Sequence, residues 1–217
     1  MSIVVRNLSE QIVDLVRNRI LSGEVPSDLP IRQDALAAEL GVSKIPLREA
    51  LARLEQDGLL RSQANRGFFV RSLSTAEAEE VYALRLKLEP DAVALASRLA
   101  DEEDRKLATR TLQQLDRATN EHGESVGAFN RAFHLALIRP CEKFLTINFL
   151  ERLQILSERY VRKHLEPLGR DERANEEHRE LLQTWLSRDA DAVASLMRTH
   201  IAQTLEDLRR QLAAEDS

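Results

Sequence analysis

Two helical patterns separated by one glycine, in "RQDALAAELGVSKIPLREALARLEQDG", constrain the fold more than any other feature of the chain. Residues 32–40 form a short helical pattern that ends at Gly41, because glycine readily adopts the left-handed conformation that terminates helices. In the second pattern Ser43 is an N-cap candidate, Pro46 is tolerated in the first turn, and Gly58 closes the helix. The segment therefore predicts a helix-turn-helix.

The segments on either side extend this unit into a winged domain. Residues 8–22 have apolar positions at a period of about 3.6 residues, which predicts an amphipathic helix. After Gly58, two short apolar segments, "LLRSQ" and "GFFVRS", flank the turn sequence "ANRG". A two-stranded wing directly after a helix-turn-helix is typical of a winged helix-turn-helix domain.

From Ser74 onward the sequence has no strand signal and predicts only helices. Ser74 or Thr75 can cap the first of these helices, and Pro90 should kink or break it near Glu89. Further helical segments are expected at roughly 101–120, 124–138, 142–165, 171–187 and 190–213. The predicted fold is mainly α, with an N-terminal winged helix-turn-helix followed by an antiparallel bundle of six or seven helices.

Charge is distributed unevenly along the chain, whose net charge is −5. Residues 1–72 carry ten basic and nine acidic side chains, whereas residues 73–217 carry 21 basic and 27 acidic ones. Within the first part, residues 42–71 hold six basic side chains against three acidic ones. We therefore expect a DNA-binding domain over residues 1–72 and a helical domain over residues 73–217.

The start of the second helix carries side chains that can read DNA, because a recognition helix presents its N-terminal residues to the base edges. Lys44 and Arg48 can donate to guanine or phosphate, and Ile45 can contact a thymine methyl group. Alternatively, Lys44 and Arg48 form only a solvated helix face, and Arg32 is a plain surface charge. The expected DNA contacts are Arg32, Ser43, Lys44, Ile45, Pro46, Arg48, Asn65, Arg66 and Gly67.

Three of the five histidines, His134, His178 and His200, fall inside separate predicted helices. A short turn joins the helices of His178 and His200, and each histidine lies about nine or ten residues from it. An antiparallel hairpin would bring both to one level, where a site shared with His134 can form. Asn130, one turn before His134, could add an amide oxygen. Such a set suits a divalent metal, and the alternative is three unrelated core or surface histidines.

The segment "LAAELGVSKIPLREALARLEQDGLL…NRGFFV" resembles the winged helix-turn-helix of the GntR family of bacterial transcription regulators. Two positions depart from the family pattern, with Lys44 where arginine is usual and Ile45 where threonine is usual. Lysine is a point charge rather than a bidentate fork, so the operator is expected to differ from those of close relatives. The helical remainder resembles the FadR-like branch, with its all-helical effector-binding domain of the FCD type.

This resemblance implies a transcription regulator, with repression relieved by ligand as the expected mode. It would bind a two-fold symmetric operator in double-stranded DNA as a homodimer. FCD-type domains that bind metal use an Asp-x-x-x-His pair on one helix and two histidines on the last two helices. The positions that match this pattern are Asn130, His134, His178 and His200. The implied cofactor is a divalent metal, zinc first, with nickel or manganese as alternatives.

Asn130 stands where aspartate is common, and a neutral amide leaves the charge of the metal uncompensated. That charge would favour an anionic ligand. Our hypothesis is that an organic acid effector completes the coordination sphere, with Arg85 as its clamp. Alternatively, Arg85 forms a structural ion pair with Glu89, four residues further on.

Other classes of protein fit the sequence less well. The single Cys141 excludes an internal disulfide and fits a cytoplasmic location. No signal peptide is apparent, and no apolar run approaches the roughly 18 residues that span a membrane.

Three histidines also describe catalytic zinc, but no "HExxH"-type pair is present, so we do not expect an enzyme. A purely structural DNA-binding protein would not need a histidine-lined pocket. His122 and His164 lie near predicted helix ends and receive no role.

Overall fold

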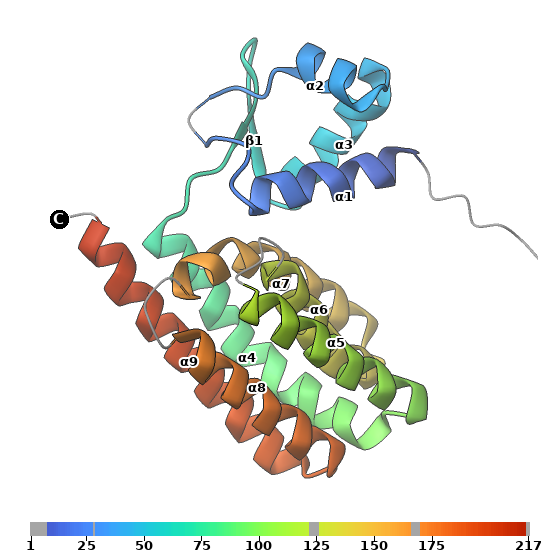
Figure 1. The fold of residues 1–217 in the computed structure, drawn as a ribbon, viewed down its shortest axis with the longest axis vertical. Helices are drawn as coiled ribbons and strands as arrows, with labels where there is room; N and C mark the ends of the chain where they lie inside the picture. The colour runs from blue at the N-terminus through green and yellow to red at the C-terminus, as the bar shows by residue number, and fades with distance from the viewer. Residues whose placement is uncertain (1–7, 28, 122–125, 166–169, 216–217) are drawn as a thin grey trace, which may run out of the picture. The chain divides into compact units, whose positions relative to one another are not determined.

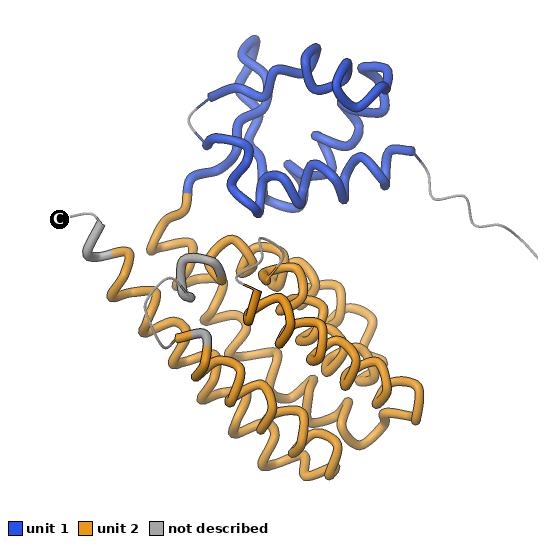
Figure 2. Tube along the Cα trace, in the orientation of Figure 1, with its two compact units in different colours: residues 1–72 blue, residues 73–217 orange. Residues whose placement is uncertain are grey.

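The computed structural model of the chain contains two compact units, Met1–Ser72 and Leu73–Ser217, and each is considered by itself (Figure 2). The described residues are 8–27, 29–121, 126–165 and 170–215. The predictions for His122 and for the side chain of His164 lie outside what the structure describes.

The first unit is a winged helix-turn-helix, as the sequence predicted. Its helices are α1 (Leu8–Leu21), α2 (Gln33–Leu40) and α3 (Lys44–Gln56), and its antiparallel strands are β1 (Leu60–Gln63) and β2 (Gly67–Val70) (Figure 1). Leu47, Leu51 and Leu54 of α3 are fully buried, and α1 packs against this helix. Between α2 and α3, Gly41 has a φ of 64°, the left-handed conformation that only glycine adopts at little cost. This conformation produces the tight turn that presents the start of α3.

The wing is a short hairpin whose turn uses asparagine and glycine as expected. Leu60 pairs with Val70, and Gln63 pairs with Gly67. Asn65 and Gly67 have φ values of 60° and 89°, the left-handed region that these two residue types tolerate best.

The second unit is a bundle in which six α-helices lie within the described residues (Figure 1). The α-helices are α4 (Thr75–Leu99), α5 (Glu102–Asn120), α6 (Val126–Ile138), α7 (Phe144–Leu165), α8 (Arg170–Leu186) and α9 (Ala190–Glu215). A short 3-10 helix, η1 (Arg139–Cys141), joins α6 to α7. α4 contacts α6, α7, α8 and α9, and it lies along α9 in the most extensive of these contacts. α4 is therefore positioned to bring its side chains into the interior of the bundle.

Pro90 does not break α4, which is continuous from Thr75 to Leu99. Proline inside a helix removes one backbone hydrogen bond and costs about 3 kcal/mol. Pro90 is itself buried, as are Glu89 and Val93 around it, so bundle packing on several sides holds the helix together. Of the kink or break expected near Glu89, the break was wrong, because that expectation considered only the local backbone.

The two serines predicted as N-caps, Ser74 and Ser43, differ in whether the side chain accepts a capping hydrogen bond. The Ser74 hydroxyl accepts a hydrogen bond from the backbone N–H of Glu77 at 3.1 Å, which confirms it as the cap of α4. Ser43 occupies the N-cap position of α3, but its side chain accepts no capping bond from the described residues. None of the described helices is both long and apolar enough to cross a membrane.

Candidate functional site

Three histidines from three helices meet inside the bundle. His134 comes from α6, His178 from α8 and His200 from α9, and all three are buried. One ring nitrogen of each lies within 4.8 Å of those of the other two. The rings of His178 and His200 are 4.8 Å apart between centroids, because α8 and α9 form the hairpin that sets them level. The structure thus brings together the histidines that the sequence singled out.

The histidines line a cavity to which all six helices of the bundle contribute. The cavity is partly open to solvent. Its apolar lining includes Leu115, Val126 and Ile201, and its polar lining includes Asn130, Asn175 and Thr204. Asn130 is buried one helical turn before His134, so its amide belongs to the same site.

Glu89 lies against His134 and is fully buried. Its Oε1 atom is 2.8 Å from Nδ1 of His134 and accepts a hydrogen bond from Gln154 at 2.9 Å. Arg85 donates to both carboxylate oxygens of Glu89, at 2.8 and 3.2 Å. Burial alone would raise the pKa of Glu89, but the charge of Arg85 and the hydrogen bond from His134 outweigh it and lower the pKa below its usual value. Glu89 is therefore a carboxylate that can only accept hydrogen bonds.

The contact with Glu89 fixes which nitrogen of His134 carries a proton. Burial lowers the pKa of His134 by more than the hydrogen bond and charge of Glu89 raise it, so the imidazole is neutral. Its single proton lies on Nδ1, which donates to the carboxylate. Nε2 is then a buried acceptor, and it has no hydrogen-bond partner among the described residues. A neutral imidazole with a free lone pair is the form that binds a metal.

For Arg85 the sequence left two alternatives open, a structural ion pair with Glu89 and a clamp for an effector. Arg85 forms the buried ion pair with Glu89, and it also lines the cavity. Its guanidinium lies over the ring of Tyr82, 5.1 Å from the centroid. The two bonds to Glu89 use Nε and Nη2, so Nη1 is not engaged by that carboxylate. Burial raises the pKa of the Tyr82 hydroxyl to about 12, although the neighbouring charge of Arg85 opposes this rise.

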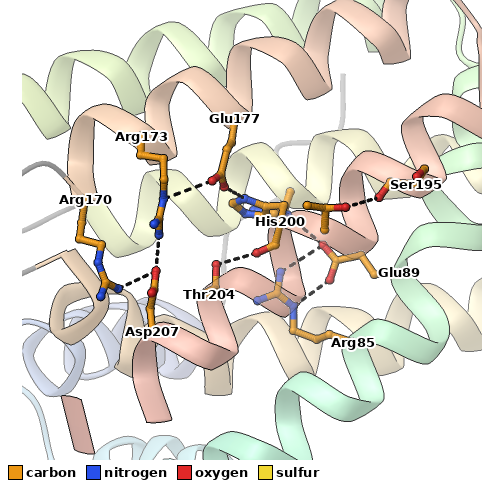
Figure 3. A network of polar contacts seen from close by, with 11 residues as sticks. Arg85, Glu89, Arg170, Arg173, Glu177, Ser195, His200, Thr204 and Asp207 are labelled. Carbon is orange, nitrogen blue, oxygen red and sulfur yellow. Dashed lines mark hydrogen bonds and ion pairs between the residues drawn. The ribbon is translucent and has the colours of Figure 1, made fainter. Parts of the chain in front are cut away.

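His200 has a carboxylate partner of its own. Nδ1 of His200 lies 2.6 Å from Oε2 of Glu177 on α8. The other oxygen of Glu177 is 3.3 Å from Nε of Arg173, and Arg173 also pairs with Asp207. Asp207 in turn pairs with Arg170 at 2.6 Å. Figure 3 shows this line of alternating charges running from Arg170 to the ring of His200.

The donor set fits a borderline divalent metal. Three imidazoles with one nitrogen each within 4.8 Å of the others, and an amide oxygen one turn away, match the ligand preferences of zinc, nickel or manganese. The orphaned, buried Nε2 of His134 is the observation that such an ion would explain. His134, His178, His200 and Asn130 would hold it.

The first unit exposes the side chains expected to contact DNA at the start of α3. Ser43, Lys44 and Arg48 are exposed, Pro46 is half-buried, and Ile45 is 72% exposed although it is apolar. Lys44 forms an ion pair with Asp34 of α2 at 2.6 Å, and both side chains are solvated. Such a pair is worth about 1 kcal/mol or less, so it can be exchanged for a phosphate or a base.

The other expected DNA contacts lie on the wing and at α2. Asn65 and Arg66 are exposed in the turn before β2, which Gly67 begins, and Arg32 is exposed at the N-cap position of α2. The guanidinium of Arg66 lies 6.0 Å from the ring centroid of Phe69. Arg61, which was not among the expected DNA contacts, lies 5.1 Å from the same ring. Its place in the basic segment 42–71 was the only signal for it.

Three polar residues of the cavity region were missed from the sequence. Glu89 was considered only as a partner of Arg85, and Glu177 was given no role. Gln154 lies 65 residues from Glu89 along the chain and belongs to no motif, so no pattern connects the two. Contacts of this kind depend on how α4, α6 and α7 pack, which local periodicity does not specify.

An exposed helix-turn-helix with a wing, in one chain with a helical bundle that holds a histidine-lined cavity, is the arrangement of a DNA-binding transcription regulator. Comparison with protein families agrees. The family of bacterial regulatory proteins named gntR matches residues 8–70, and the FCD domain matches residues 80–203. The chain belongs to the gntR family of bacterial regulatory proteins, in the branch with an FCD domain.

Individual relatives support the same assignment. The chain is 31% identical to the uncharacterized HTH-type transcriptional regulator BphR of Paraburkholderia xenovorans, over 95% of this chain and 87% of that protein. It is 26% identical to the HTH-type transcriptional repressor GlaR of Escherichia coli, over 91% of this chain and 94% of that protein. The solved structure of E. coli McbR/YncC has the same fold, with a TM-score of 0.80 at 23% identity over 94% of this chain and 98% of that one. These relatives and families are regulators of transcription and not enzymes.

Proposed function

We propose that this regulator is a repressor controlled by a small carboxylate metabolite, which binds in the cavity of the bundle together with a divalent metal. The observation that carries the proposal is the convergence of His134, His178 and His200 within 4.8 Å on a cavity that Arg85 also lines. GlaR, a relative over most of the chain, is named as a repressor. The single buried Cys141 agrees with action in the cytoplasm.

Asn130, His134, His178 and His200 would hold the metal, with zinc as the first choice and nickel or manganese as alternatives. None of the four would bring a negative charge when it binds the ion, so the ligands themselves leave the charge of the ion uncompensated. A divalent ion bound there would supply a positive centre for an anionic oxygen of the effector. This charge balance favours organic acids over neutral metabolites.

Arg85 would bind the second end of the effector. Its Nη1 atom is not used by Glu89, and its guanidinium is held in place by Glu89 and by the ring of Tyr82. A guanidinium fixed in this way loses little entropy when it binds a carboxylate. The hydroxyl of Tyr82, which also lines the cavity, is a further polar group on this wall.

Operator recognition would rest on α3 and the wing. Lys44, Arg48 and Ile45 are exposed at the start of the recognition helix, and Arg66 is exposed on the wing. Ser43, Pro46, Asn65, Gly67 and Arg32 complete the set of proposed contacts. Exposure of Ile45 to 72% is expected of a side chain that packs against a base rather than against the protein.

A two-fold symmetric operator calls for a homodimer, so that each copy reads one half-site. Three large apolar side chains on the first turns of α7 support this: Phe144, Leu145 and Phe149 are 75%, 69% and 62% exposed. Exposed aromatic side chains grouped on one helix are typical of an association surface. We propose that a second copy of the chain covers them.

Calorimetry would test the metal-bridged effector. Small organic acids are titrated into zinc-loaded and metal-free protein, and binding is expected only in the loaded form or at least tenfold tighter there. The His178→Ala variant should behave as metal-free protein under both conditions, whereas Glu180→Ala, an exposed change on the same helix, should match the wild type. Equal affinity in the two forms would contradict the metal bridge, and an operator gel shift with any ligand found would test repression.

A further inference from the structure

We propose that Glu89 and Glu177 are positioning residues of the histidine site. Each carboxylate engages Nδ1 of one histidine, His134 or His200, and so leaves Nε2 as the nitrogen available for coordination. As far as it concerns metal, this inference rests on the function proposed above. The tautomer of each ring is a property of the chain itself, which can be measured without metal.

The carboxylate of Glu89 is held in place by residues other than His134. Arg85 holds both of its oxygens, and Gln154 donates to Oε1, the same atom that contacts His134. Arg85, Glu89 and Gln154 are almost completely buried, so water does not compete for these bonds. A carboxylate whose oxygens are so fully used is unsuited to be a metal ligand. It acts instead as a rigid acceptor that sets the rotation of the imidazole.

The carboxylate of Glu177 is held in place by a different set of residues, a chain of ion pairs. One oxygen contacts His200 at 2.6 Å, and the other contacts Arg173 at 3.3 Å. Arg173 is held in turn by Asp207, and Asp207 by Arg170 (Figure 3). The two carboxylates come from different helices, α4 and α8, and approach two different rings. The same arrangement therefore occurs twice in one site by independent routes.

The arrangement has a chemical consequence for the imidazoles. A carboxylate can only accept, so the proton of each ring is placed on Nδ1 and the lone pair on Nε2. Partial transfer of negative charge through this hydrogen bond makes Nε2 a stronger donor to a metal. Asn130 contributes no charge to the site. Glu89 and Glu177 would therefore supply, from outside the coordination sphere, part of the compensation that an aspartate ligand would give directly.

Nitrogen-15 NMR of metal-free protein tests the first half of the proposal. We expect the Nδ1–H tautomer for His134 and for His200 in the wild type. In Glu177→Leu, the signal of His200 should shift toward a mixture of tautomers while that of His134 stays unchanged. Glu177→Gln keeps an oxygen that accepts, and it should restore most of the Nδ1–H form. An unchanged His200 tautomer in Glu177→Leu would overturn the assignment.

Zinc affinity, measured by competition with a chromophoric chelator, tests the second half. We expect Glu177→Leu to bind Zn²⁺ about 10- to 100-fold more weakly than the wild type. The control Glu176→Leu, an exposed change one residue away, should remain within about twofold. Glu89→Gln is expected to weaken binding similarly. Glu89→Gln leaves Arg85 buried without its partner and could prevent folding. The comparison of Glu177→Leu with Glu176→Leu is therefore the deciding measurement.

The outcomes separate the two proposals. Zinc binding that is equally tight in Glu177→Leu and Glu176→Leu would overturn the positioning role and leave the metal site standing. A wild-type protein that binds no Zn²⁺ would remove the metal from the proposed function and with it the metal-related role of both carboxylates. In that case, a His200 tautomer that changes in Glu177→Leu would still show that the carboxylate of Glu177 sets the position of the proton on His200.

Discussion

Arg85 and Glu89 form an ion pair with both partners almost completely inaccessible to solvent. At the scale of single residues such a pair is a poor source of stability, because desolvating both charges costs as much as their attraction returns. Its value lies in geometry. The pair holds one oxygen 2.8 Å from Nδ1 of His134 and holds a guanidinium on the wall of the cavity. Two apolar residues of similar volume could fill the space, but they could not offer an oxygen to His134 or a guanidinium to the cavity.

Replacing Arg48 tests the recognition helix. Arg48 is exposed on α3, so Arg48→Ala should leave the fold intact. It should weaken binding to the operator, selected from random DNA with the purified protein, by about 1–3 kcal/mol if the side chain contacts guanine with both donors. Fluorescence anisotropy measures the affinity. Lys87→Ala removes an exposed charge from the bundle and serves as the control. Equal affinity of the two variants would remove Arg48 from the readout set.

Removing metal tests the histidine cluster through stability. Zinc in excess, at 100 times its dissociation constant, should stabilise the folded protein by about 2.7 kcal/mol relative to chelator-treated protein. Differential scanning calorimetry should show the transition of the bundle moving up. In His200→Ala the shift should be lost, whereas Gln203→Ala, an exposed change on the same helix, should retain it. A shift that persists in His200→Ala would locate the metal elsewhere.

The histidine cluster could be predicted from sequence because it depends on one simple relationship. His178 and His200 lie at similar distances along the chain from a short turn. In an antiparallel helical hairpin, two residues at equal distances from the turn lie at the same level and therefore close together. The contact of Glu89 with His134 has no such basis, since 45 residues and two further helix junctions separate them. Gln154 is equally remote. Side chains that meet through packing of non-adjacent helices become evident only from the structure.

At the scale of elements, α4 combines features that the sequence treated separately. It begins at a serine cap, carries Arg85 and Glu89 in its middle, and passes Pro90 without a break. The boundaries of the other helices and of the wing agreed with the periodicity to within about two residues. Pro90 was the exception, because proline rules describe an isolated helix and not one that packs against four others.

Removing the cap of α4 should have a measurable cost. Ser74→Ala loses the hydrogen bond from the N–H of Glu77, and it should lower the free energy of unfolding by about 1 kcal/mol. The hydrogen bonds that Tyr160 makes to the backbone of Ser74 would remain. Urea denaturation followed by circular dichroism gives the change. Ser72→Ala, exposed and outside any helix, should have little effect, and equal stability of the two variants would argue against the cap.

At the scale of the whole molecule, each of the two units has its own apolar core. The first is built on Leu47, Leu51 and Leu54 of α3, and the second includes Trp185, Phe133 and Tyr82. The helix-turn-helix unit and the helical unit can then be altered independently. This separation accords with a family in which the gntR and FCD regions are recognised as two domains.

Association of two copies can be tested at the apolar surface of α7. Phe144→Ser combined with Phe149→Ser should convert a dimer into a monomer, because two large exposed rings no longer bury their area against the partner. Size-exclusion chromatography with light scattering measures the mass. Leu99→Ser changes another exposed apolar side chain at the end of α4 and should leave the dimer intact. A double variant that is still dimeric would place the contact on another surface.

Nε2 of His134 makes no hydrogen bond to any described residue, and this has a consequence for how long the protein survives in the cell. A buried acceptor without a partner costs about 1–3 kcal/mol of folding free energy. A bound ion would remove that cost and add its own binding energy. Proteases that cleave transiently unfolded chains degrade a protein in proportion to the population of its open form. If the metal site proposed above is correct, the intracellular half-life of this regulator should follow the metal supply, and starvation for the metal would deplete the protein as well as leave it unloaded.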